Sequence, residues 1–101
     1  MEDEIPKIYE TEGTPLEKKI IYQKWYMEKI GFYWLIAELD RKTRIAFGYA
    51  NLNNDDFAEW GYIDLFDLKH EGARRDEFWE PCTFEEAQKK IRQYRRGFYQ
   101  R

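Results

Sequence analysis

Cysteine, histidine, proline and glycine are scarce in this chain. Its 101 residues include one cysteine, one histidine, three prolines and six glycines. A single cysteine, Cys82, excludes an internal disulfide framework. Cys82 and His70 are too few to hold a structural zinc ion without several carboxylates. The glycines are scattered and form no phosphate-binding loop, so we expect neither a metal nor another cofactor.

Long apolar runs are also absent. No apolar stretch approaches the ~18 residues that span a bilayer, which predicts a protein that does not enter the membrane. The first four residues are mostly acidic, the reverse of the start of a secretory signal peptide. We therefore expect a cytoplasmic protein. The high fraction of charged residues, 37%, is also typical of proteins from thermophiles.

Aromatic residues, in contrast, are abundant and make up 19% of the chain. Each aromatic side chain buries roughly 150–250 Å², so a core needs few of them. Hydrophobic residues reach 43%, and no linker or low-complexity segment interrupts the sequence. The length and composition predict a single domain over residues 1–101.

The net charge of −3 hides an uneven distribution. All 20 acidic residues precede position 89, whereas residues 89–101 contain only basic charges. Such a basic tail can contact nucleic-acid phosphates, and the candidate residues are Lys89, Arg92, Arg95 and Arg96. The alternative is that these cations only complement the dipole of a helix end. The sequence pI of about 5.3 argues against a dedicated nucleic-acid binder.

The first half of the chain predicts three strands. A capped helical turn is expected at 15–18, with Thr14 as its N-cap. β-branched and aromatic residues then favour a strand at 19–27 over the alternative, a longer helix. Residues 32–39 are apolar on both faces, as in a central strand. In the next strand, 44–50, a face of small residues around Gly48 indicates that another backbone or a helix approaches closely.

The middle of the second half predicts a strand, a short helix and an edge strand. Residues 51–57 have the composition of a loop, and 59–64 that of a strand. Asp64 is expected to cap a short helix that Gly72 terminates. A short edge strand is expected at 75–79, before Pro81.

The last helix has the strongest pattern. Thr83 and Glu86 form a capping box, and apolar residues recur behind it at helical spacing up to about residue 96, with Gly97 as the expected stop. This apolar stripe must bury against another surface. The fold class is therefore α+β: a small antiparallel sheet of four to five strands, a short middle helix, and a C-terminal amphipathic helix packed on the sheet.

The order of several short motifs resembles one known family. The motifs are Lys7-Ile-Tyr-Glu-Thr-Glu12, Trp34-Leu-Ile-Ala-Glu-Leu-Asp40, Phe47-Gly-Tyr49, Glu59-Trp-Gly-Tyr-Ile-Asp-Leu65, Arg75-Asp76 and Trp79-Glu-Pro81. Together they resemble the family catalogued as domain of unknown function 2958. The resemblance covers residues 5–90, and the basic extension at 92–101 lies outside it.

This resemblance implies a fold and a genomic setting. Members of the family are typically encoded on plasmids, phages and other mobile elements, and they have no established activity. At the start of the middle helix, Asp64 stands where the family usually has serine; both residues cap helices. The resemblance therefore implies no catalytic residue and no mechanism.

The acidic residues of the strands offer a weak case for catalysis. Glu38 and Asp40 lie on one face of a strand, and Glu59 and Asp64 lie on a strand that could be nearby, so they could bind Mg²⁺ or act as an acid–base pair. With 20 acidic residues in the chain, such proximity is expected without function. The alternative is that Asp40 is a turn residue and Asp64 a helix cap, while Glu38 and Glu59 pair across strands with lysine or arginine. One such pair would be bidentate, between Arg75 and Glu59. We therefore expect a protein that is not an enzyme.

The aromatic residues of the strands offer a better case for binding. Exposed aromatic patches mark protein interfaces, and the candidates are Trp25, Tyr26, Trp60, Tyr62 and Trp79. The alternative is that these rings only fill the core. The sequence thus favours a small non-enzymatic protein-interaction module of mobile-element origin, which binds another protein or itself as a homodimer. The alternative function is an accessory nucleic-acid binder that uses the basic C-terminal helix.

Overall fold

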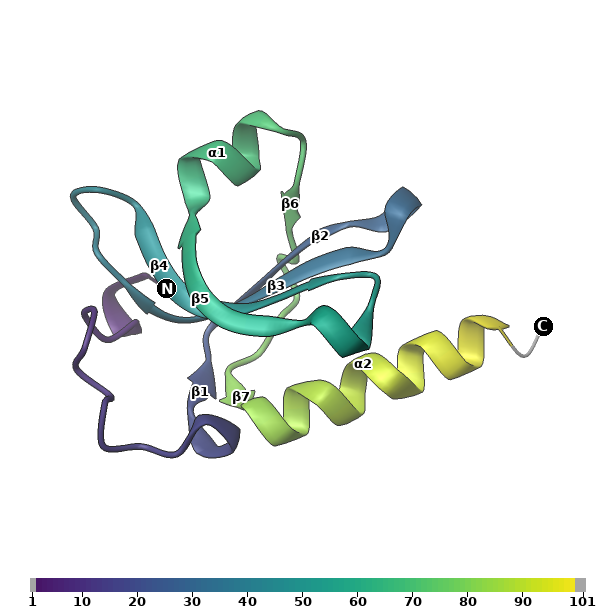
Figure 1. Ribbon diagram of the computed structural model, residues 1–101, viewed down its shortest axis with the longest axis horizontal. Helices are drawn as coiled ribbons and strands as arrows, with labels where there is room; N and C mark the ends of the chain where they lie inside the picture. Colours follow the sequence, from purple (N-terminus) through teal and green to yellow (C-terminus); the bar gives the residue numbers. More distant parts are fainter. Residues whose placement is uncertain (1, 100–101) are drawn as a thin grey trace.

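The computed structural model describes the backbone of residues 2–99 and the side chains of residues 2–95. Two antiparallel sheets and two α-helices make an α+β fold, as the sequence predicts (Figure 1). The main sheet has the strand order β5-β4-β3-β2-β6. These strands are β2 (Gln23–Met27), β3 (Phe32–Leu39), β4 (Ile45–Leu52), β5 (Glu59–Asp64) and β6 (Arg74–Arg75). The second sheet pairs β1 (Ile20–Ile21) with β7 (Cys82–Thr83).

The two helices cover opposite faces of the main sheet. In the view of Figure 1, α1 (Leu65–His70) lies above the sheet and α2 (Phe84–Tyr99) below it. Leu65 and Leu68 of α1 join a buried cluster with Trp34 of the sheet. On the other face, Ala87 and Ile91 of α2 join a second cluster, which contains Tyr33, Leu35 and Ile21. The central strand β3 supplies both clusters, which explains why it is apolar on both faces.

The strand expected at 19–27 is split in two. Tyr22 separates β1 from β2, and its N–H donates to the carbonyl of Ile36 at 2.9 Å. The split lets β1 leave the main sheet and pair with β7, directly before α2. The longer helix considered as an alternative does not form. In its place, a 3-10 turn, Leu16–Lys18, forms just before β1. Thr14 is not its cap, because Pro15 occupies that position without a side-chain hydrogen bond.

A bulge in β3 changes which side chains share a face. Ile36 pairs with Gly48 and Glu38 pairs with Phe47, so Ala37 is an extra residue in the ladder. Glu38 therefore lies on the same face as Phe47. At Gly48, a Cβ atom would lie 2.0 Å from the carbonyl oxygen of Leu35, so the expected close backbone approach is confirmed.

Caps fix both helix starts as the sequence predicts. The carboxylate of Asp64 accepts hydrogen bonds from the N–H groups of Phe66 and Asp67, and Gly72, with φ of 99°, follows the end of α1. At α2, the N–H of Glu86 donates to Thr83 Oγ1 at 3.2 Å. The expected stop at Gly97 is wrong, since α2 continues to Tyr99; glycine in a helix costs only about 1 kcal/mol and does not break it.

The edge strand β6 is shorter than expected. Only Arg74 and Arg75 pair, with Tyr26 and Trp25 of β2, instead of the whole segment 75–79. The expected pair between Arg75 and Glu59 is wrong, because β6 and β5 form opposite edges of the sheet. Three further 3-10 turns, Glu2–Glu4, Glu28–Ile30 and Asp55–Phe57, connect the elements. Within the described chain, no helix is long and apolar enough to cross a membrane.

Candidate functional site

The outer edge of β5 is unpaired within the described residues, because β5 is the last strand of the sheet. The N–H of Leu65 donates to the carbonyl of Arg44, and Asp64 is paired with Ile45. Along an antiparallel strand, every second residue bonds to the neighbouring strand. Gly61 and Ile63 therefore bond to β4, as Leu65 does, while the backbone groups of Trp60 and Tyr62 point outward. The edge thus presents the donors and acceptors that another strand needs.

Aromatic rings line the α2 side of this edge. Phe47 stacks on Trp60 at 5.5 Å and meets Tyr62 edge-on at 5.8 Å, as measured between ring centroids. Trp60 also packs on Phe84, the first residue of α2, at 4.9 Å. Tyr62 is 59% exposed, and Trp60 and Phe47 are half-buried. We call Phe47, Trp60 and Tyr62 the β5 aromatic surface.

The N-terminal segment contacts this surface through a second tyrosine. The hydroxyl of Tyr62 donates to the hydroxyl of Tyr9 at 3.0 Å, and both rings are exposed. The hydrogen bond to Tyr9 raises the pKa of Tyr62 above its ordinary value. Tyr9 therefore extends the β5 aromatic surface, although its sequence pattern gave no reason to select it.

The other aromatic candidates lie elsewhere. Trp25 is only 8% exposed and belongs to the core under α1, so it cannot contribute to a surface of the folded chain. Its indole N–H donates to Gln23 Oε1 at 3.0 Å. Tyr26 and Trp79 are half-buried on the α2 face of the sheet, near the opposite edge from β5. The five candidates thus divide into a core residue and two separate surfaces.

Tyr26 and Trp79 line a groove between α2 and the β2–β3 hairpin. Its volume is about 450 Å³. Lysine ammonium groups lie over its rings: Lys24 is 5.7 Å from the ring centroid of Tyr26, and Lys90 is 5.3 Å from that of Trp79. We call it the α2 groove. Its lining residues are Lys24, Tyr26, Met27, Glu28, Gly31, Phe32, Tyr33, Asp76, Trp79, Lys90, Ile91, Tyr94 and Arg95.

The basic candidates of α2 do not form one surface. The guanidinium of Arg95 turns back onto the fold, where it donates to the carbonyl of Gly31 at 3.1 Å and lies 5.2 Å from the ring centroid of Tyr33. Lys89 and Arg92 are exposed and lie one turn apart. The side chain of Arg96 lies outside the described residues.

The acidic candidates are separated as well. Asp40 accepts from the N–H groups of Lys42 and Thr43 in the hairpin turn, Asp64 caps α1, and Glu59 is exposed at the start of β5. Within residues 2–95, no group of three or more acidic, histidine or cysteine side chains is arranged to hold a metal ion.

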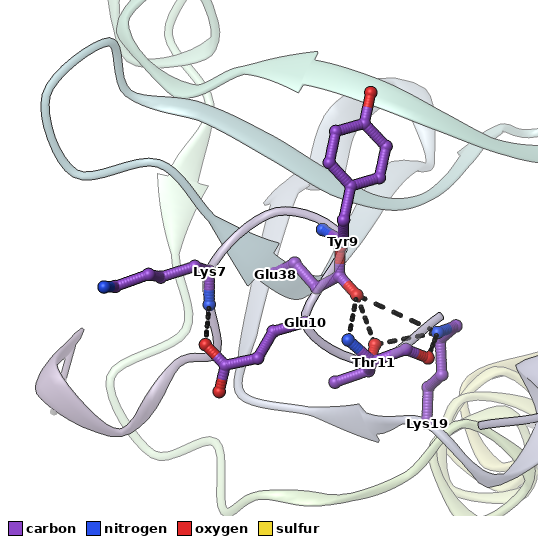
Figure 2. A network of polar contacts seen from close by, with 6 residues as sticks. All are labelled: Lys7, Tyr9, Glu10, Thr11, Lys19 and Glu38. Atoms are coloured by element: carbon purple, nitrogen blue, oxygen red, sulfur yellow. Dashed lines mark hydrogen bonds and ion pairs between the residues drawn. The ribbon is translucent and has the colours of Figure 1, made fainter. Parts of the chain in front are cut away.

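Glu38 has a different role, in a buried polar network (Figure 2). Its carboxylate accepts from the N–H of Tyr9 at 2.9 Å, and from the N–H and hydroxyl of Thr11. The ammonium of Lys19 lies 3.9 Å from the same carboxylate and donates to Thr11. The sequence predicts a lysine or arginine partner for Glu38 on a neighbouring strand. The partner is a lysine, but it comes from the N-terminal segment.

The unique cysteine and histidine are far apart in the fold. Cys82 lies on β7, in the cluster under α2, and burial raises the pKa of its thiol. His70 ends α1 on the other side of the sheet, where its ring stacks on Phe66 with centroids 5.4 Å apart. They therefore do not form a nucleophile–base pair.

Comparison with known proteins gives no assignment. No family model, no curated protein and no solved structure matches this chain. The resemblance to the domain of unknown function 2958 family stays a prediction from the motifs.

Proposed function

We propose that this protein is a non-enzymatic protein-interaction module that binds an extended segment of a partner protein along β5. The observation that carries the proposal is the open edge of β5 beside exposed aromatic rings. Strand addition to such an edge supplies main-chain hydrogen bonds, and neighbouring side-chain surfaces supply specificity. The outward groups of Trp60 and Tyr62 would form the bonds, and the β5 aromatic surface would contact alternate side chains of the partner.

The charges of β5 indicate the chemistry of the partner segment. Glu59 and Asp64 lie at the two ends of the strand, so a segment with basic residues at its ends fits best. On the face away from α2, a Cβ atom at Gly61 would meet no atom within 4 Å. That space can receive an apolar side chain of the partner. The preferred segment therefore alternates β-branched residues between basic ends.

Self-association through the same edge is the competing assembly. Because the backbone groups of Trp60 and Tyr62 point outward, two copies can pair antiparallel with Trp60 of each opposite Tyr62 of the other. Glu59 then lies opposite Ile63 and not opposite Asp64, so the charges of β5 do not decide between a second copy and another partner. A homodimer through β5 is therefore an outcome that the experiment distinguishes, not the proposed assembly.

The test uses a blocked peptide as long as β5, with alternating threonine and valine between lysine ends. We expect amide NMR signals of Trp60 and Tyr62 to shift on titration, with a Kd that rises only modestly with salt, because exposed charge pairs at the strand ends contribute little of the binding free energy. The control is the same peptide with the residue opposite Tyr62 replaced by proline, because proline lacks a backbone donor. Equal shifts with both peptides, or shifts that avoid β5, would contradict strand addition.

Two protein variants distinguish the contribution of the Tyr62 backbone N–H to peptide binding from that of its ring. Tyr62→Pro removes an outward N–H without removing a bond to β4, and proline is tolerated at such edge positions. Tyr62→Ala removes the ring but keeps the N–H. We expect both variants to weaken peptide binding and Tyr62→Pro to abolish it. Circular dichroism and the melting temperature of each variant serve as the folding control.

Nucleic-acid binding is the competing function, supported by the exposed neighbours Lys89 and Arg92 on α2. Binding through phosphates weakens steeply as salt rises, unlike binding through an apolar interface. Lys89→Gln together with Arg92→Gln would abolish nucleic-acid binding and leave the peptide titration unchanged. Retention of an oligonucleotide at physiological salt by the parent protein, and its loss in this variant, would favour this function.

The family resemblance supports a mobile-element origin for the module. The motif at 59–65 contains β5, and the motif at 79–81 contains Trp79 of the α2 groove. The structure of a family member would test the relationship. The same strand order with an open edge at the equivalent of β5 is expected, and a different topology would contradict it.

A further inference from the structure

The α2 groove is a second concave surface, independent of β5. It lies between α2 and the β2–β3 hairpin, on the same face of the sheet as the β5 aromatic surface but near the opposite edge. Ile91 and Tyr33 are buried in its lining, while Tyr26 and Trp79 are half-buried. Its volume of about 450 Å³ falls in the range of ligand sites, which are mostly apolar with a few placed polar groups.

Two lysines supply the positive charge of the groove. Lys24 lies 5.7 Å from the ring centroid of Tyr26 and 5.9 Å from that of Tyr94, and Lys90 lies 5.3 Å from that of Trp79. Among the described residues, the ion pairs involve neither lysine. Burial lowers the pKa of Lys24, and the charge of Asp76 opposes that effect. A partly desolvated ammonium without an ion pair, such as that of Lys24, gains from an incoming anion, and the exposed Lys90 adds a second positive charge.

The other charged groups of the groove are already engaged. Arg95 donates to the carbonyl of Gly31. Asp76 accepts from the N–H of Phe78 at 3.0 Å, and Glu28 accepts from the hydroxyl of Tyr94 at 3.4 Å. These two carboxylates would repel a continuous phosphate backbone. An isolated anion can instead approach the lysines and avoid them.

We propose that the α2 groove binds an organic carboxylate attached to a planar apolar group. The planar group lies against the rings of Tyr26 and Trp79, where stacking adds to apolar burial. The carboxylate lies between Lys24 and Lys90, where it forms charge-assisted hydrogen bonds. The same chemistry occurs in a free aromatic acid and in a peptide with neighbouring aromatic and acidic residues.

The test titrates the full chain with phenylacetate, followed by NMR at the indole N–H of Trp79. That N–H donates to the carbonyl of Ile21 at 3.1 Å, so it reports on the wall of the groove. Phenylacetamide is the neutral control of the same shape, and the dipeptide phenylalanyl-glutamate tests the peptide source. Tighter binding of either acid than of the amide is expected, and the tighter of the two identifies the source. Equal binding of acids and amide, or no binding of either acid, would overturn the proposal.

Lysine variants test whether the carboxylate of the ligand lies between Lys24 and Lys90. Lys24→Met and Lys90→Met keep the length and the apolar stem of the side chain but remove the charge. Each is expected to weaken acid binding roughly tenfold, the usual effect of losing a charged hydrogen bond. Lys89→Met is the matched control, since Lys89 is exposed and does not line the groove; no change is expected. Equal effects of all three variants would overturn the proposal, as would displacement of the acid by single-stranded oligothymidylate.

The outcome is separable from that of the β5 experiment. Tyr62→Pro alters the opposite edge of the sheet and should leave acid binding unchanged. Conversely, Lys24→Met should leave the β5 peptide titration unchanged.

Discussion

The ammonium of Lys19 lies 3.9 Å from the carboxylate of Glu38, and both side chains are almost completely buried. This pair attaches the N-terminal segment to the central strand (Figure 2). Glu38 also holds the N–H of Tyr9, a residue with φ of 72°, which few residues other than glycine adopt. Because Tyr9 contacts Tyr62, the network positions part of the β5 aromatic surface.

Breaking the pair from one side should destabilise the fold. Glu38→Gln leaves the Lys19 ammonium buried without a counter-charge, and Lys19→Met does the same to the carboxylate. Each should lower the free energy of unfolding by about 3–5 kcal/mol. The double variant should lose less than the sum of the two losses, by roughly 0.5–3 kcal/mol. Urea unfolding at neutral pH gives the free energy of unfolding of the parent protein, the two single variants and the double variant. Additive losses would show that the pair is not coupled.

Two glycines of the sheet should respond oppositely to alanine. Gly48→Ala would place a Cβ atom 2.0 Å from the carbonyl oxygen of Leu35, so the strands must shift, at a cost of about 1–3 kcal/mol or more. Gly61→Ala meets open space and removes flexibility from the unfolded chain, so its stability should be unchanged or slightly higher. Thermal unfolding of the two variants provides the comparison. A similar loss at both positions would contradict the close approach at Gly48.

The cap of α1 should tolerate one substitution and not another. Asp64→Ala removes the acceptor for the N–H groups of Phe66 and Asp67 and should cost about 0.5–2 kcal/mol. Asp64→Ser keeps an acceptor and is also the residue expected from the family resemblance. We expect Asp64→Ser to stay close to the parent protein in chemical denaturation. An equal loss for both substitutions would mean that capping is not the role of Asp64.

The start of α2 should weaken in acid. Hydrogen bonds from Thr83, first from its backbone N–H, hold the pKa of Glu86 below the ordinary value of 4.5. A lowered pKa in the folded state means that the carboxylate stabilises the helix start above pH 4.5 and loses this effect as pH falls through its folded-state pKa. An NMR titration of the Glu86 carboxyl should give a midpoint below 4.5 in the parent protein and a higher one in Thr83→Ala. A parent midpoint at or above 4.5 would contradict the capping box.

Local patterns in the sequence predicted much of the fold. Strands 32–39 and 59–64 and the caps at Asp64 and Thr83 follow from short-range periodicity and hydrogen-bonding chemistry. The break at Tyr22 could not be predicted that way. It depends on the carbonyl of Ile36, a contact between residues distant in the chain.

The candidate sites were less predictable, for the same reason. Trp60 and Tyr62 were selected as aromatic residues of a strand, but only the strand order makes β5 an edge. Trp25 is also an aromatic residue of an expected strand, but it lies in the core. The α2 groove brings Lys24 to a face shared with Lys90, which no spacing in the sequence indicates.

Hydrogen exchange of the β5 amides tests the central claim most directly. In the free protein, Gly61 and Ile63 should exchange slowly, because their N–H groups bond to β4, while Trp60 and Tyr62 exchange rapidly. Addition of the threonine–valine peptide should slow Trp60 and Tyr62 selectively. If these two amides are already slow in the free protein, or stay fast when the peptide is saturating, β5 is not an open docking edge. Slowing that grows with protein concentration alone would instead identify a second copy of the chain as the occupant.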